Sequence, residues 1–168
     1  MSESRTRPDC AVTLGPGIHQ QLLPPDNLRF SVAIPDGYES GRPVPLVLAL
    51  HYGGTVTPFY GMGLLQGLVE PALRQLGAII AAPDNVANGW SNPRSEANVL
   101  ALLDAIQEDY SIDPGKTLLL GYSMGGMGTW YLAARHPERF KAAIPIAGRP
   151  VWPRDFELAC SSLRHPRP

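Results

Sequence analysis

One serine in this 168-residue chain stands in a pattern that can do chemistry. Ser123 lies between Gly121 and Gly125, which gives the pattern Gly-x-Ser-x-Gly in the form GYSMG. A short apolar run, Thr117–Leu120, precedes the pattern, and a predicted helix follows it. In this strand-to-helix context the serine hydroxyl is held out at the carboxyl end of a strand, where it can attack a bound substrate.

The turn at Ser123 has to be so sharp that the serine takes up a strained backbone conformation. Glycines on either side remove the Cβ atoms that would collide there. The helix that follows supplies backbone N–H groups and a partial positive charge. Two other glycine-rich motifs are excluded, because no Gly-Lys-Ser/Thr is present for a phosphate-binding loop and Tyr131 stands where a dinucleotide fingerprint needs its third glycine.

The elements around the motif alternate between strands and helices. Leu28–Ile34 alternates apolar and polar residues and predicts a strand paired antiparallel with Ile18–Leu23. From residue 45 onward, continuous apolar runs alternate with helical spacing, which predicts a parallel sheet with helices on both faces. The predicted strands are Leu46–His51, Ala78–Ala82, the run from Thr117 and Phe140–Ile146; the predicted helices are Gly61–Leu76, interrupted at Pro71, a helix capped by Asn92 that reaches Tyr110, and Met124–Arg135.

Composition narrows the range of partners and locations. The chain carries 14 Lys and Arg against 15 Asp and Glu, a formal net charge of -1, and no basic block, so neither nucleic acid nor an anionic membrane surface is expected as a partner. Cys10 and Cys160 form no metal-binding or disulfide pattern. No apolar run is long enough to insert into a membrane and the first residues, 1–8, show no signal peptide, so the cytoplasm is the default location.

The elements predict a single folded unit with two irregular ends. Residues 1–10 are expected to form a flexible tail, and residues 11–148 form the α/β core. Residues 149–168 contain four prolines and little periodicity, so no regular strand is expected there.

The serine motif, the loop His51-Tyr52-Gly53-Gly54 and the order of the strands together resemble the α/β-hydrolase fold. The resemblance covers roughly residues 28–148 and is nearest to small carboxylesterases, phospholipase/thioesterases and polyhydroxybutyrate-depolymerase-like esterases. It implies a serine esterase that acts on a small-molecule ester through an acyl-enzyme and needs no cofactor and no metal. The motif is specific for the fold and much less specific for the substrate, for which Phe59, Tyr60, Met62, Trp90 and Met127 are candidate pocket walls.

The resemblance also assigns the groups that stabilise the oxyanion. They are the N–H of Met124, directly after the nucleophile, and an N–H of the loop after His51, for which Gly53 is chosen. The family more often has glycine where Tyr52 stands, so Tyr52 and Gly54 stay open as alternatives. His51 itself is interpreted as a structural residue that orients the loop, since the triad order in this family is serine, acid, histidine.

The acid and the base of the triad are not fixed by the sequence. In the family they follow the seventh and eighth strands, and this chain lacks the last two strands of that pattern. Asp155 and His165 are the only pair in the right order after Ser123. The alternative is therefore a C-terminally truncated hydrolase-fold remnant that is non-catalytic or weakly active and is completed by oligomerisation. The strand at residues 140–146 would then be an exposed edge and a site of homo-oligomer formation.

Overall fold

The computed structural model describes residues 14–151 and residue 157. Its strands are β1 (Gly17–Leu23), β2 (Leu28–Ile34), β3 (Val44–Leu50), β4 (Ile79–Pro83), β5 (Ile112–Tyr122) and β6 (Ala142–Ile146). Its helices are α1 (Gly61–Leu64), a π-helical turn (Leu65–Val69), α2 (Glu70–Leu73), a 3₁₀ turn (Arg74–Leu76), α3 (Pro93–Asp109) and α4 (Met124–Arg135). The predicted alternation of strands and helices after residue 45 is confirmed.

The strands form one sheet with the order β1-β2-β4-β3-β5-β6. The N-terminal hairpin is antiparallel, with Gly17 opposite Ile34, and β2 joins β4 antiparallel as well. The remaining pairs, β3 with β4, β3 with β5 and β5 with β6, are all parallel. The carboxyl ends of four parallel strands therefore meet at one edge of the sheet, which is the edge where open α/β sheets bind ligands.

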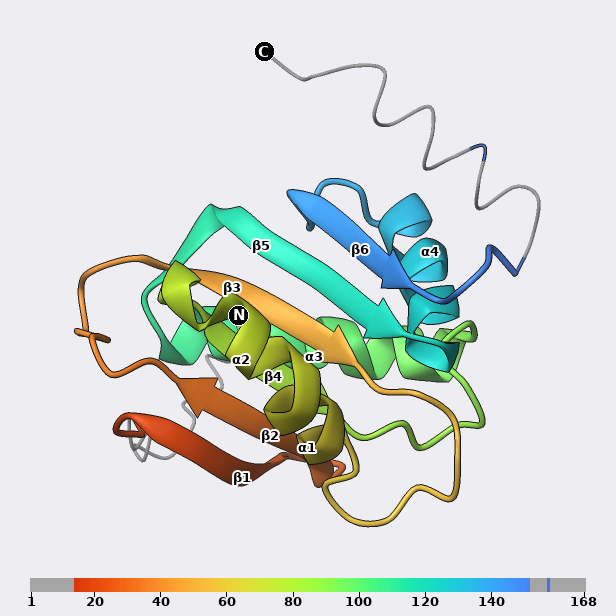
Figure 1. Cartoon of the computed structure of the whole chain (residues 1–168), viewed down its shortest axis with the longest axis horizontal. Helices are drawn as coiled ribbons and strands as arrows, with labels where there is room; N and C mark the ends of the chain where they lie inside the picture. The colour runs from red at the N-terminus through yellow and green to blue at the C-terminus, as the bar shows by residue number, and fades with distance from the viewer. Residues whose placement is uncertain (1–13, 152–156, 158–168) are drawn as a thin grey trace, which may run out of the picture.

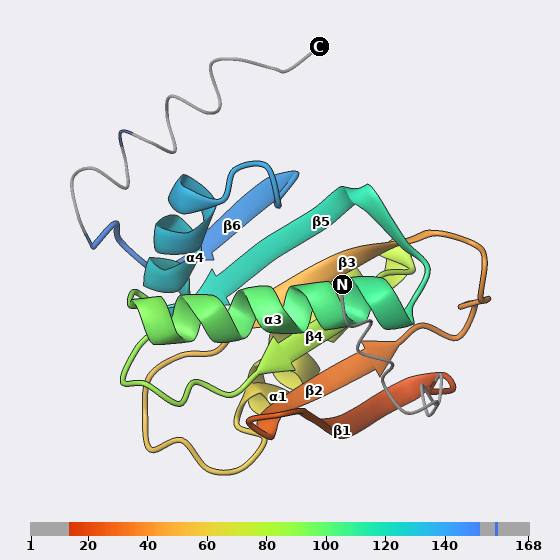
Figure 2. The same cartoon turned by 180° about the vertical axis from the view of Figure 1, so that it is seen from behind.

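Helices cover both faces of the sheet, as the fold class requires (Figures 1 and 2). On one face α3 and α4 pack Leu103, Ile106 and Leu132 against Leu48 and Leu119. On the other face α1 and the π-helical turn bury their apolar residues against Val47, Ala49 and Ile80 of the central strands; these helical residues are Leu64, Leu65 and Val69. The central strand β3 is buried between the two layers, which makes it the rigid support of the loop that follows it.

Two helices show how local sequence fixes their bounds. Asn92 caps α3, since its Oδ1 accepts a hydrogen bond of 3.0 Å from the N–H of Ser95, and Pro93 is the first helical residue. The helical segment after Gly61 is broken as predicted: a π-helical turn precedes α2, and Pro71 lies in the first turn of α2, where its missing N–H costs nothing.

The predicted bounds were wrong at β5 and β6. The strand predicted from Thr117 begins earlier, at Ile112, and runs through Asp113-Pro114-Gly115. The register shows why: Val44 of β3 pairs with Ile112, and Leu46 pairs with Thr117, so the turn-forming residues bulge out of a continuing strand. The strand predicted at Phe140–Ile146 is shorter and begins at Ala142.

Within the described residues β6 lies at the edge of the sheet, and no helix lies in front of β5 and β6 on the face that α1 covers elsewhere (Figure 1). Ala142, Ala143 and Ile144 are exposed. An uncovered apolar edge is a general site of strand pairing between chains. Self-association through residues 140–146 therefore stays a prediction.

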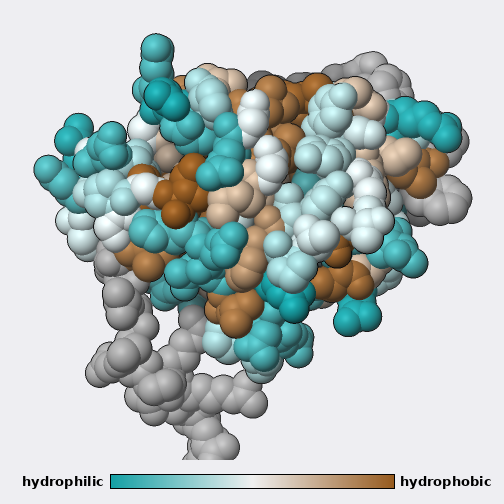
Figure 3. Space-filling view, turned by 60° about the horizontal axis from the view of Figure 1, so that its bottom comes forward, coloured by the Kyte–Doolittle hydropathy of each residue, from teal (hydrophilic) through white to brown (hydrophobic). Residues whose placement is uncertain are grey.

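Apolar side chains elsewhere on the surface are scattered. Figure 3 brings the lower side of Figure 1 forward, and apolar residues form small patches among polar ones there. Leu22 is 52% exposed, and Leu76 and Val86 are exposed on other elements. Isolated exposed residues of this kind are normal for a folded domain.

Candidate active site

Ser123 occupies the junction between β5 and α4 in a conformation that few residues adopt. Its backbone has φ 54° and ψ -111°, a strained combination for a residue with a side chain. The N–H of Ser123 donates to the carbonyl of Ile146 at 2.8 Å, and the carbonyl of Ser123 accepts from Met127 at 3.1 Å. The serine side chain does not cap the helix. The turn is thus held by β6 and α4 through its backbone, and the half-buried hydroxyl is not used in capping.

The glycines that flank Ser123 are required by close packing, as the motif predicted. A Cβ on Gly121 would lie 2.6 Å from Oγ1 of Thr129 and would overlap the carbonyl of Gly125. A Cβ on Gly125 would lie 2.9 Å from the carbonyl oxygen of His51 and would overlap that of Leu50. The first turn of α4 is therefore pressed directly against the ends of β5 and β3.

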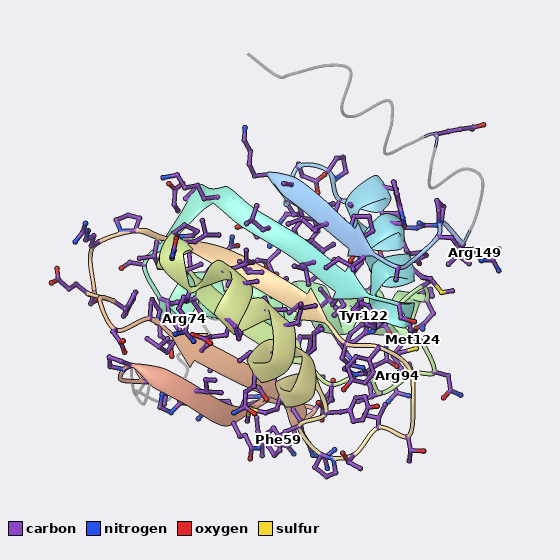
Figure 4. All side chains as sticks on the ribbon, viewed as in Figure 1. Phe59, Arg74, Arg94, Tyr122, Met124 and Arg149 are labelled. Atoms are coloured by element: carbon purple, nitrogen blue, oxygen red, sulfur yellow. The ribbon has the colours of Figure 1, made fainter. Side chains whose placement is uncertain are left out.

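Met124 is the first residue of α4, directly after the serine. The first N–H groups of a helix have no intrahelical acceptor, so the Met124 N–H is free of the helix ladder. Figure 4 shows Tyr122 and Met124 together at the carboxyl end of β5. A negative charge developing beside Ser123 would meet this N–H and the positive end of the helix dipole.

Gly53 lies beside Met124, on the loop that follows β3. A Cβ on Gly53 would be 3.8 Å from the Met124 side chain. The preceding carbonyl, that of Tyr52, bonds to Nδ1 of His51 at 2.7 Å. Because a trans peptide is planar, the Gly53 N–H points opposite to this carbonyl, away from the His51 ring. The structure thus places the residues Gly53 and Met124 side by side, and the role of their N–H groups as an oxyanion hole stays a prediction.

His51 is fully engaged and is not placed to act as a base. Its Nε2 accepts a hydrogen bond of 2.9 Å from the N–H of Asn85, so the proton is on Nδ1, which donates to Tyr52. The side chain is buried, and its carbonyl accepts from Nε1 of Trp90 at 2.9 Å. The interpretation of His51 as a structural residue that orients the loop is confirmed. Its partner Asn85, which lies two residues after the end of β4, carries no signal in the sequence pattern.

Burial lowers the pKa of the His51 imidazole below its ordinary value, and the hydrogen bond to Tyr52 and the charge of Asp84 offset this only partly. An unfolded histidine binds a proton below about pH 6.5, whereas the folded His51 does so only at lower pH. The folded state should therefore lose stability as the pH falls below about 6.5 toward the lower pKa of the folded state.

Urea unfolding at pH 7.5 and pH 5.5 tests this, with His51→Gln as the variant and His19→Gln on β1 as its control. The loss of stability on acidification should be smaller in His51→Gln than in the wild type, because glutamine does not titrate. His19→Gln should keep the wild-type difference. An equal loss in all three proteins would show that His51 does not carry it.

The other described histidines lie away from Ser123. His19 on β1 bonds to the carbonyl of Gly15. His136 follows α4, whose 12 residues place it roughly 18 Å along the helix from the serine. Its Nε2 is 2.6 Å from Oε1 of Glu96, a partner on α3 that the sequence pattern did not indicate. Of the three histidines in residues 14–151 none is placed as a base, and both Asp155 and His165 lie outside the described residues.

The aromatic residues near the site divide into two groups. Trp90, predicted as a candidate pocket wall, is 1% exposed and belongs to the core. Tyr52 instead contacts two other tyrosines edge to face at the carboxyl edge of the sheet: its ring is 5.5 Å from that of Tyr60 and 6.1 Å from that of Tyr122. Tyr122, the residue before Ser123, is 40% exposed.

Two classes of feature are not found among the described residues. No group of three or more His, Cys, Asp or Glu side chains in residues 14–151 is arranged to hold a metal ion. No helix of this part of the chain is both long enough and apolar enough to cross a membrane.

Comparison with known proteins agrees with this geometry. The family model of the alpha/beta hydrolase fold matches residues 45–159, so the chain belongs to the alpha/beta hydrolase fold family. The "Probable feruloyl esterase C" of Aspergillus niger is 26% identical over 148 residues, covering 81% of this chain and 50% of that protein. Feruloyl esterase C of Emericella nidulans is 27% identical over 132 residues, covering 71% and 46%.

Solved structures share the fold. The crystal structure of a thermostable esterase superposes with a TM-score of 0.67 at 23% identity and covers 84% of this chain and 43% of its own. The chain spans about half the length of the curated relatives that it matches.

Proposed function

We propose that this chain is a serine carboxylic-ester hydrolase that acts through an acyl-enzyme on Ser123. The observation that carries the proposal is the conformation of Ser123, with φ 54° at the junction of a buried parallel strand and a helix. Such backbone strain is maintained at functional sites, where it holds a group in place for chemistry. The membership of the chain in the alpha/beta hydrolase fold family and its similarity to esterases support the same function.

The proposed reaction has two steps. The Ser123 hydroxyl loses its proton to a base and attacks the ester carbonyl, and the oxyanion accepts hydrogen bonds from the N–H groups of Met124 and Gly53. The alcohol leaves with that proton, which gives the acyl-serine. A water molecule then attacks the acyl carbonyl by the same route and releases the acid. This chemistry requires no metal and no cofactor. None of the three histidines in residues 14–151 is placed as its base within one chain, so the candidates are His165 with Asp155, the pair in the right sequence order, or a residue of a second chain.

The acyl group of the substrate is proposed to be aromatic. The relatives in Aspergillus and Emericella are named feruloyl esterases, and feruloyl esters carry an aromatic acid. The cluster of Tyr52, Tyr60 and Tyr122 beside Ser123 supports this proposal, because aromatic rings bind other rings edge to face or by offset stacking. A non-aromatic acetyl ester should be the poorer substrate.

Labelling of the purified chain with a fluorophosphonate probe, mapped by mass spectrometry, tests the nucleophile. Ser123 should react with the probe. Ser123→Ala should reduce the labelling by more than about 1,000-fold, because the variant lacks the hydroxyl that attacks the probe. The loss of labelling in His165→Ala as well would identify the base. Labelling of another serine, or none at all in the wild type, would contradict the proposal.

A second function, that of a non-catalytic hydrolase-fold module, is favoured by one observation. In the described residues His51, His19 and His136 are all engaged elsewhere. If the wild type is not labelled, this function becomes the better one. Labelling that appears only in an oligomer would indicate that a second chain completes the site. The cytoplasmic location stays a prediction.

A further inference from the structure

The loop that carries Gly53 is fixed at its far end by a buried carboxylate. Asp84 follows β4 and is 2% exposed. Its Oδ2 accepts a hydrogen bond of 2.7 Å from the N–H of Phe59, and its Oδ1 accepts one of 3.1 Å from the N–H of Gly61. A buried carboxylate is costly unless hydrogen bonds compensate it, and here the two backbone donors do so.

The segment that Asp84 holds has an unusual backbone and fits tightly. Phe59 has φ 60°, a left-handed conformation that a residue with a side chain adopts only when its surroundings impose it. A Cβ on Gly61 would lie 2.6 Å from the carbonyl oxygen of Ala82. Figure 4 shows Phe59 at the start of α1, below the carboxyl ends of the strands. The segment from Phe59 to Gly61 is therefore held tightly against β4.

Tyr60, which lies between the two bonded residues, connects this segment to the other end of the loop. Its ring centroid is 4.9 Å from that of His51 and 5.5 Å from that of Tyr52, both edge to face. Its hydroxyl is 3.4 Å from the carbonyl oxygen of Gly53. At this length the hydrogen bond orients the ring but contributes little to stability. A Cβ on Gly54 would lie 3.5 Å from Cζ of the same ring. Tyr60 thus packs directly on the residues proposed to form the oxyanion loop.

Two consecutive residues of one strand end therefore hold both ends of the loop. Asn85 bonds to His51 at the start of the loop, and Asp84 bonds to Phe59 and Gly61 at its end. Between them residues 53–58 are exposed. We propose that Asp84 is a positioning residue for catalysis: it holds Tyr60 against the loop and so fixes the direction of the Gly53 N–H. The catalytic part of this inference rests on the proposed esterase function.

Asp84→Asn is the direct test, with Asp36→Asn as the matched control. Asparagine keeps one acceptor and turns an N–H group toward the other backbone donor, so one of the two bonds is lost. Asp36 is exposed in the turn after β2, and its change to asparagine should be silent. Hydrogen exchange measured by mass spectrometry should be at least about tenfold faster for residues 52–61 in Asp84→Asn, with β3 and β5 unchanged.

Kinetics with p-nitrophenyl acetate distinguish a positioning role of Asp84 from a purely structural one, because only a positioning role predicts a change in kcat without a similar change in KM. In Asp84→Asn kcat should fall about 100-fold with KM within about threefold of the wild type, because misplacing a donor affects the transition state more than binding. Unchanged exchange of the loop would overturn the inference. Faster exchange with unchanged kcat would overturn its catalytic part.

The two proposals can fail separately. If the wild type neither hydrolyses the ester nor reacts with fluorophosphonate, the esterase proposal fails, and hydrogen exchange alone decides whether Asp84 fixes the loop. If Asp84→Asn does not fold, Tyr60→Ala replaces it under the same criteria, with Tyr60→Phe as the conservative variant that keeps both ring contacts. Tyr60→Ala should accelerate exchange of the loop at least about tenfold, and Tyr60→Phe should not.

Discussion

Replacing Gly125 by alanine should lower the free energy of unfolding by at least about 3 kcal/mol and abolish labelling of Ser123. The new Cβ would overlap the carbonyl of Leu50 and would lie 2.9 Å from that of His51. Both neighbours are backbone at the end of the central strand, so no side-chain rotation makes room. α4 would have to move away from β3, and with it the backbone that holds Ser123.

Gly67→Ala is the control for this prediction. Gly67 lies in the π-helical turn with nothing within 4 Å of its Cβ position, so alanine there should be neutral or stabilising by about 0.5–1 kcal/mol. Urea unfolding of the two variants and the wild type measures the difference. If Gly125→Ala retained wild-type stability and labelling, the close contact between α4 and β3 could not be what positions the serine.

Most of the fold follows from local sequence, because local signals and tertiary contacts agree. α4 begins and ends at the predicted residues, since glycines force the turn before it and His136-Pro137 stops it. β2 also has its predicted bounds. β5 does not, because Asp113-Pro114-Gly115 has all the properties of a turn, and only pairing with β3 shows that the strand continues past it.

The site was predictable in part for the same reason. Ser123 and Met124 are adjacent in sequence, so the motif alone places them together. Gly53 lies beside Met124 because the parallel strands β3 and β5 are neighbours in the sheet. The fold class predicts that the two strands are neighbours, but it does not predict which of their residues lie opposite each other. Asp84 was not predicted, since a carboxylate after a strand has no sequence signal that pairs it with N–H groups about 25 residues earlier.

Trp90→Ala should be the second most damaging change, with a loss of about 3–5 kcal/mol on unfolding. Trp90 was predicted as a candidate pocket wall from its place after a strand end, but its side chain is 1% exposed. Its Nε1 donates to the carbonyl of His51, and its ring is 5.0 Å from the His51 ring. The indole also packs against α4, where a Cβ on Gly128 would lie 2.9 Å from its Cγ.

Trp90→Phe separates the two contributions of this residue, because phenylalanine keeps much of the packing and loses the N–H. Its loss of stability should be well below that of alanine, with about 1 kcal/mol from the hydrogen bond and the remainder from the smaller ring. Urea unfolding gives both values, and hydrogen exchange of residues 52–61 shows whether the His51 carbonyl needs its donor. If Trp90→Ala cost less than about 1 kcal/mol, the indole would not be part of the core that joins α4 to the loop after β3, and the support of that loop would rest on Asn85 and Asp84 alone.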